Sequence, residues 1–161
     1  MSSEPAVPPT PSAPKKFPLG RVILIAIAAV IVCFGCIQLV PINRTNPPVV
    51  QEPDWDSQQT RALAQRACFD CHSNETTWPW YSTVAPVSWY VYFDVVRARR
   101  ELNFSDWQTG SSGTRQADRI TRNISSGEMP PGNYLMLHPD ARLSAAERQQ
   151  LIDGIKATLR Q

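Results

Sequence analysis

Glycine is scarce in this chain of 161 residues, where 7 glycines stand against 15 prolines. Because hairpin turns favour glycine and proline is confined to the edges of sheets, this ratio argues against a sheet-rich fold. No alternating apolar pattern exceeds three or four residues, and no internal repeat is present. An excess of basic charge is also missing, since 16 Lys and Arg face 14 Asp and Glu. We therefore expect an all-α protein with one domain, an appended segment and no nucleic-acid partner.

A long apolar run stands out near the N-terminus. Residues 22–40 carry no charged side chain, and a helix of that length spans roughly 28 Å, close to the ~30 Å hydrocarbon core of a bilayer. We predict a single transmembrane helix over this range. A cleaved signal peptide, a lipoprotein signal ending at Cys36 and a buried core helix fit less well. No small-residue cleavage site follows Leu39, and the run is long and purely apolar for a core helix.

The charges around this run predict its orientation. Lys15, Lys16 and Arg21 flank its N-terminal side, and the positive-inside rule keeps such a flank in the cytoplasm. Everything from Pro41 onward is then exported. In that exported part the acidic and basic residues balance.

Composition divides the chain into four segments. Residues 1–21 are rich in proline, serine and alanine and are expected to form a disordered cytoplasmic tail before the transmembrane helix. Residues 41–53 contain four prolines and no periodicity, which predicts a semi-rigid linker. Residues 54–161 are expected to form the exported, helical domain.

Capping residues and apolar spacing predict the helices of this domain. The four expected helices run from Asp54 or Asp56 into Cys68, from Pro86 to Leu102, from Arg115 to Ser125, and from a capping box of Ser144 and Glu147 to Leu159. Their stripes are expected to hold Trp89, Phe93, Val96 and Arg100 in the second helix, Ala117, Ile120 and Ile124 in the third, and Leu151, Ile155 and Leu159 in the last.

The sequence Cys68-Phe69-Asp70-Cys71-His72 is the C-x-x-C-H signature of covalent haem attachment. Two thiols three positions apart can each add to one vinyl group of a haem, which forms two thioethers. The adjacent His72 then presents its imidazole to the iron as the proximal ligand. We predict one covalently bound haem c.

Other uses of these cysteines fit less well. A zinc ribbon needs a second thiol pair, and the available pair, Cys33 and Cys36, lies inside the apolar run. A redox C-x-x-C is expected after a strand, and none is predicted there. A disulfide between Cys68 and Cys71 is possible in an exported domain but leaves His72 unexplained.

A sixth ligand to the iron has few candidates. The exported part holds two histidines and two methionines. Met129, followed by two prolines on an expected extended loop, is the favoured distal ligand. His138 is the alternative, while Met136 or an open site stands third. If they do not bind the iron, Met136 is expected to fill space in the core and His138 to lie at the surface or face a propionate.

Two further groups have competing interpretations. Trp78, Trp80 and Tyr81 could pack on the haem or contact its propionates, or they could belong to the ordinary core. The arginines at positions 97, 99 and 100 could neutralise propionates, but a solvated helix face is favoured.

The domain resembles the small c-type haem-binding domain family of membrane-anchored bacterial cytochromes. The resemblance covers roughly residues 55–160 and is carried by residues 68–76, 78–81, 85–89, 103–107, 129–131, 137–139 and 143–144. More distantly, the order of helix, C-x-x-C-H, Met-Pro loop and final helix is similar to that of cytochrome c. The resemblance implies haem binding and leaves the electron partners undefined.

These observations predict a monohaem c-type cytochrome, anchored in the bacterial inner membrane with its haem domain in the periplasm. We expect one-electron transfer with redox proteins of the periplasm or membrane, and no enzymatic activity or catalytic residues. The alternatives are a haem-based sensor or peroxidase-like enzyme with an open distal site, and an accessory subunit of a respiratory complex. A second C-x-x-C-H, which a dihaem peroxidase would need, is absent from the sequence.

Overall fold

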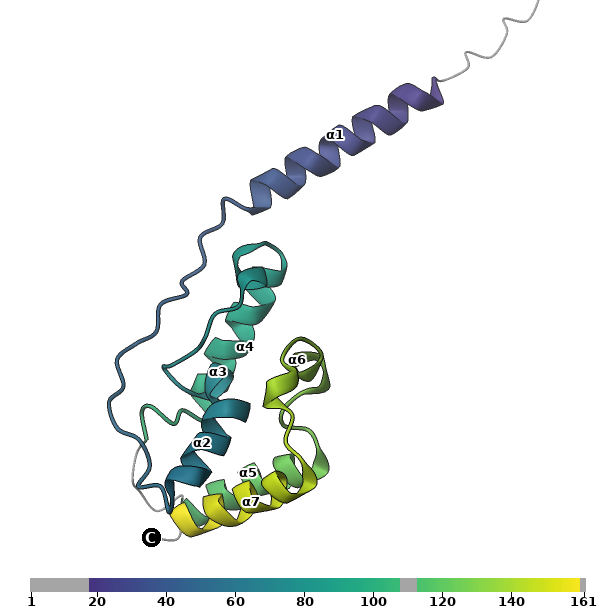
Figure 1. Cartoon of the computed structure of the whole chain (residues 1–161). Helices are drawn as coiled ribbons and strands as arrows, with labels where there is room; N and C mark the ends of the chain where they lie inside the picture. Colours follow the sequence, from purple (N-terminus) through teal and green to yellow (C-terminus); the bar gives the residue numbers. More distant parts are fainter. Residues whose placement is uncertain (1–17, 108–112, 160–161) are drawn as a thin grey trace, which may run out of the picture. The chain divides into compact units, whose positions relative to one another are not determined.

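The computed structural model describes residues 18–107 and 113–159 (Figure 1). Its regular elements in this part of the chain are all helices, accompanied by one isolated bridge between Gln51 and Asp106. The all-α prediction is confirmed. The chain divides into two units, residues 1–40 and 41–161, and each is described by itself.

The first unit contains α1, Leu19–Ile37, a helix of 19 residues that is long and apolar enough to cross a membrane. It begins and ends three residues earlier than predicted. Pro18 occupies the N-cap, where its fixed φ and missing N–H suit a helix start. Pro41 disfavours helical geometry in the residue before it, so the helix ends in a turn. Residues 1–17 of the expected tail lie outside the described residues.

The second unit is a cluster of short and medium helices. In chain order these are α2 Gln58–Ala67, α3 Phe69–His72, the 3₁₀ turn η1 Trp80–Thr83, α4 Val87–Glu101, α5 Gly113–Ser126, α6 Gly132–Leu137, the 3₁₀ turn η2 Pro139–Ala141, and α7 Ala145–Thr158.

The cap of α2 is Ser57 rather than Asp54 or Asp56. The Ser57 hydroxyl accepts a hydrogen bond from the backbone N–H of Thr60 at 3.1 Å. The Asp56 side chain faces another partner, because its Oδ1 accepts a hydrogen bond from the Thr158 hydroxyl at the end of α7 at 3.4 Å. The predicted capping box of α7 is confirmed: the Ser144 side chain accepts from the backbone of Glu147, and the Glu147 side chain accepts from the backbone of Ser144.

The core lies between α2, α5 and α7, with α3 at its edge. The predicted stripes of α5 and α7 are confirmed, since Ala117, Ile124, Leu151 and Ile155 are buried. Ile120 and Leu159 are partly buried and pack against the core. Gly154 of α7 lies against the buried side chain of Thr60 on α2. The two helices can approach this closely because position 154 has no Cβ.

The predicted stripe of α4 is wrong. Its buried residues are Ser88 and Val95, whereas Phe93 is 65% exposed. The helix packs on α3 and η1, so the face that these neighbours cover decides which residues of α4 are buried, rather than the apolar spacing.

The segment expected to be a linker is hydrogen-bonded to the domain. The backbone N–H of Val50 donates to the Ser105 carbonyl at 2.8 Å, and Gln51 accepts from the N–H of Trp107 at 2.9 Å. Glu52 pairs with Arg61 of α2 at 2.6 Å. Residues 50–52 are therefore part of the packed body of the second unit.

Candidate functional site

The turn that carries the C-x-x-C-H motif is held by the residue between its cysteines. Phe69 is 2% exposed and stacks on Phe104, with ring centroids 5.6 Å apart. Because this side chain points into the core, the flanking Cys68 and Cys71 face away from it. The backbone N–H of Phe104 also donates to the His72 carbonyl at 2.8 Å, which fixes the end of the turn.

The imidazole of His72 has a defined orientation. Its Nδ1 lies 3.2 Å from the Ala98 carbonyl oxygen and 3.1 Å from that of Leu102. Carbonyls only accept, so Nδ1 carries the proton and Nε2 keeps its lone pair. Burial lowers the pKa of His72, which favours the neutral ring. This is the form in which a histidine binds a metal.

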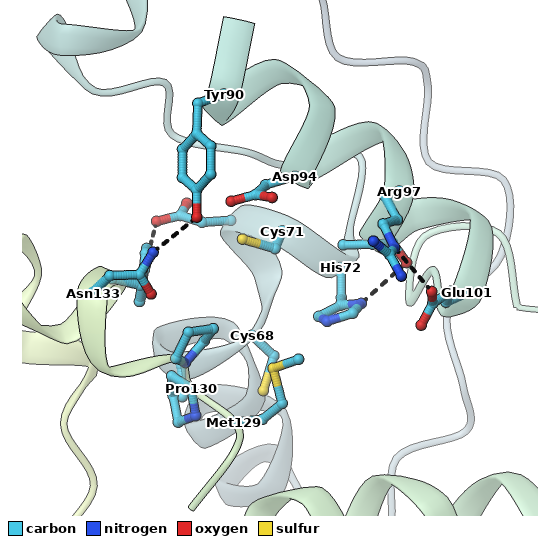
Figure 2. Close-up of a pocket in the computed structure, with 15 residues that line it drawn as sticks. Cys68, Cys71, His72, Tyr90, Asp94, Arg97, Glu101, Met129, Pro130 and Asn133 are labelled. Carbon is cyan, nitrogen blue, oxygen red and sulfur yellow. Dashed lines mark hydrogen bonds and ion pairs between the residues drawn. The ribbon is translucent and has the colours of Figure 1, made fainter. Parts of the chain in front are cut away.

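A cavity of about 360 Å³ brings this histidine together with three sulfur atoms (Figure 2). Cys68, Cys71 and His72 line it on the α3 side, and Met129 and Pro130 face them from the loop after α5. A smaller adjoining cavity of about 90 Å³ is also lined by Cys68, His72 and Met129.

The two cysteines are free, partly exposed thiols. Burial raises the pKa of Cys68 to about 12 and that of Cys71 to about 11. Both are therefore uncharged at neutral pH, as suits an apolar cavity. Cys33 and Cys36, the other C-x-x-C pair, are exposed on α1.

Met129 reaches the cavity because α5 ends sharply. Gly127 adopts a φ of +79°, a left-handed conformation that favours glycine at the end of a helix. The backbone N–H of Met129 then donates to the Asn123 carbonyl at 3.0 Å, which ties the loop to the last turns of α5. Met136, by contrast, lies on α6 and is 80% exposed, so it is neither a core filler nor a cavity residue.

His138 does not line the cavity of His72. It stacks on Tyr134, with ring centroids 4.0 Å apart, and its Nδ1 lies 3.0 Å from the Tyr134 carbonyl oxygen. Its Nε2 lies 3.3 Å from the Tyr81 hydroxyl, which can donate to it. Both ring nitrogens of His138 thus have partners in the protein. The geometry favours Met129 over His138 as the distal ligand, and ligation by Met129 stays a prediction.

The aromatic cluster lies outside this cavity as well. The indole N–H of Trp78 donates to the Asn46 side chain at 3.3 Å. Trp80 and Tyr81 line a neighbouring cavity of about 520 Å³. None of these three residues is among those that line the cavity of His72. Their positions therefore give no support to the predicted contacts with a haem.

The three arginines have different surroundings. Arg97 lines the cavity and pairs with Glu101, with 3.4 Å between Nε and Oε1. Arg99 donates to the Ser73 carbonyl at 2.7 Å and to the Thr76 hydroxyl at 2.8 Å, so it braces the loop after the motif. Arg100 is exposed.

Four residues that the sequence reasoning missed hold α6 over the cavity. The Asn133 amide donates to the Tyr90 hydroxyl at 3.1 Å, and the Tyr134 hydroxyl donates to the Asp70 carboxylate at 2.7 Å. No local sequence signal pairs Tyr90 with Asn133. Asp70 could have been identified as a site residue, because it lies inside the C-x-x-C-H motif.

The donor set fits a haem. A neutral imidazole with a free Nε2, two thiols on the same turn and a thioether across the cavity are the groups that hold a c-type haem. Among the residues that the structure describes, none hydrogen-bonds to Nε2 of His72.

Comparison with known proteins agrees with this chemistry. No curated protein and no solved structure matches the chain. A family model described as a haem-binding domain matches residues 32–157, most of the sequence. The chain therefore belongs to the haem-binding domain family.

Proposed function

We propose that this haem protein is a membrane-anchored monohaem c-type cytochrome that transfers one electron at a time at the periplasmic face of the bacterial inner membrane. One observation carries the proposal. A single cavity collects both thiols of the motif, the free Nε2 of His72 and the thioether of Met129. Bound haem supplies a reversible Fe(III)/Fe(II) couple.

The residues around the cavity have separate roles in this proposal. Cys68 and Cys71 would hold the haem through two thioethers, with each S–H adding across one vinyl group so that sulfur and hydrogen go to neighbouring carbons. His72 binds the iron through Nε2, held in place by the carbonyls of α4. Met129 lines the same cavity as His72, and its thioether would be the second protein ligand, which would exclude water and small ligands.

This ligand set supports an electron carrier rather than an enzyme or a sensor. Two protein ligands leave no iron position open, so small molecules have nowhere to bind. An absorption spectrum of the purified, oxidised protein tests the point. We expect a low-spin spectrum with a weak Met–iron band at its red end, a reversible one-electron titration, and no change when CO is added to the reduced protein. A high-spin, CO-binding haem would overturn the carrier assignment in favour of the sensor or enzyme.

Anchoring rests on α1 and the charges before it. The helix has 19 residues, of which only Arg21, near its start, is charged, and Lys15, Lys16 and Arg21 precede its apolar part. Protease added to intact spheroplasts should digest residues beyond Pro41 and spare an N-terminal tag. Digestion of the tag with protection of the haem domain would show the opposite topology. With this topology, we propose that the partners are redox proteins of the periplasm or membrane.

A further inference from the structure

The neighbouring cavity of about 520 Å³ opens as a groove between η1, α4 and α6. Four of the residues that line it are large, apolar or aromatic, and exposed: Trp80 at 79%, Val87 at 45%, Tyr90 at 57% and Leu137 at 63%. We call these four residues the apolar corner. Contiguous exposed apolar groups of this kind mark interaction surfaces. The haem site uses Tyr90 alone among them.

Charge at the groove does not suggest an ionic partner. Its lining includes Asp70 and Asp94 but no lysine or arginine. The lining itself therefore offers no positive charge to nucleic acid or to anionic headgroups. Trp and Tyr side chains, which combine an apolar body with a polar tip, are instead typical of the interface between a bilayer and water.

The chain leading from α1 is bound beside this corner. The Arg44 guanidinium donates to the Ser82 carbonyl of η1 at 3.2 Å, in the same turn as Trp80. The Asn46 amide donates to the Thr76 carbonyl at 2.9 Å, and Thr76 also lines the groove. The exported chain is thus fixed to the domain at η1 within a few residues of its start.

Chain length then limits how far the corner can be from the bilayer. Arg44 follows Ile37, the last residue of α1, by seven positions, and seven residues reach at most roughly 25 Å when fully extended. Because Arg44 is bonded to η1, chain length keeps η1 within reach of the end of α1. The groove also shares Asp70 and Cys71 with the haem cavity.

We infer that the apolar corner docks into the interfacial region of the lipid bilayer, with Trp80 and Leu137 inserted among the lipids. The inference rests on the membrane anchoring of the proposed function. Docking turns the Cys71 side of the haem cavity toward the membrane. Because apolar contacts drive it, docking should be insensitive to salt.

Photo-crosslinking from lipid tests this inference on the full-length haem protein. The protein is reconstituted in phosphatidylcholine vesicles that contain a phosphatidylcholine with a diazirine high on its acyl chain, then irradiated, and adducts are located by tandem mass spectrometry. We expect adducts on α1 and on the apolar corner, at both low salt and 1 M NaCl, and none at the exposed Gln150 of α7.

Each other outcome has a distinct meaning. Adducts on α1 without any on the corner would leave the anchor intact and overturn docking, since the corner would then face water or a protein. An unlabelled α1 would overturn the anchor itself. Loss of the corner adducts at 1 M NaCl would overturn the apolar mode of docking.

Variants test whether labelling depends on the apolar corner itself or only on the exposure of a large apolar side chain. Replacing Trp80→Ser and Leu137→Ser together should lower the adducts at Val87 at least fivefold and leave those on α1 unchanged. Phe93→Ser is the matched control, because Phe93 is similarly exposed on α4 but does not line the groove. Equal adducts at Val87 in the double variant and the wild type would show that the corner does not mediate the contact.

Discussion

The Leu102 carbonyl oxygen lies 3.1 Å from Nδ1 of His72. Leu102 is the C-cap of α4, so this is one of the carbonyls that a helix end leaves without an intrahelical partner. It decides which nitrogen of the imidazole keeps its lone pair. The end of α4 thereby orients the imidazole that we propose as the proximal ligand.

The first prediction concerns the distal ligand. Met129→Ala should give a high-spin or water-ligated haem with a lower potential that binds CO, because a thioether stabilises Fe(II). Met129→His should restore a low-spin haem at a potential below that of the wild type. His138→Ala is the control and should leave the spin state unchanged. A silent Met129→Ala with a high-spin His138→Ala would instead show ligation by both histidines.

The second prediction concerns covalent attachment. The haem of the wild type should survive acid–acetone extraction and stay with the chain on denaturing gels. Cys68→Ser or Cys71→Ser alone should retain it through the remaining thioether, and the double variant should lose haem staining completely. Replacing Cys33 and Cys36 on α1 by serine should have no effect. Haem that extracts freely from the wild type would disprove covalent binding.

The third prediction concerns the bond between Tyr134 and Asp70. Tyr134→Phe removes a hydrogen bond that holds α6, and with it the Met129 loop, over the motif. A loss of about 1 kcal/mol should raise the fraction of haem open to CO roughly fivefold. Tyr92→Phe is the matched control, because no described residue hydrogen-bonds to the Tyr92 hydroxyl. Equal CO binding in both variants would show that the bond does not restrain the loop.

The fourth prediction concerns the contact of α2 with α7. A Cβ at Gly154 would overlap the side chain of Thr60, which is 1% exposed and bonded to Ser57. Gly154→Ala should lower the free energy of unfolding by about 1–2 kcal/mol, since overpacking outweighs the gain in helix propensity. Gly132→Ala, where a Cβ meets no atom within 4 Å, should be neutral. Denaturant titration measures both.

The fifth prediction concerns acid stability. The backbone N–H of Ser144 and the side chain of Arg66 lower the pKa of Glu147 from 4.5 to about 2. A lowered pKa stabilises the fold above the ordinary value, and that stabilisation is lost as pH falls from about 4.5 to about 2. Glu147→Gln should therefore be less stable than the wild type near pH 6, and the difference should vanish near pH 2. A stability difference between Glu147→Gln and the wild type that stays constant with pH would contradict the charge effect.

Local patterns predicted much of this fold. The capping box at Ser144, the stripe of α7 and the attachment motif each depend on residues a few positions apart, so their geometry follows from a single helix or turn. The exposed Phe93 and the cap at Ser57 were missed for the opposite reason. Asp56 is bound to Thr158, 102 positions away, and no local pattern reports such a pairing.

The candidate site shows the same division. His72 and its cysteines follow from spacing, whereas the positions of Met129 and His138 depend on how distant segments pack. Nε2 of His138 is hydrogen-bonded to the hydroxyl of Tyr81, 57 positions earlier in the chain. Sequence alone could name the two candidates but could not show that one faces the cavity of His72 and the other a neighbouring cavity.

The burial of Phe69 makes the attachment motif a part of the hydrophobic core. Its ring lies 5.6 Å from Phe104 and 6.3 Å from Trp55, so the same packing that closes the core also sets the spacing and direction of both thiols. The residues between the cysteines are therefore not interchangeable spacers. A polar residue at position 69 would impair haem binding, although Cys68, Cys71 and His72 would all remain in the sequence.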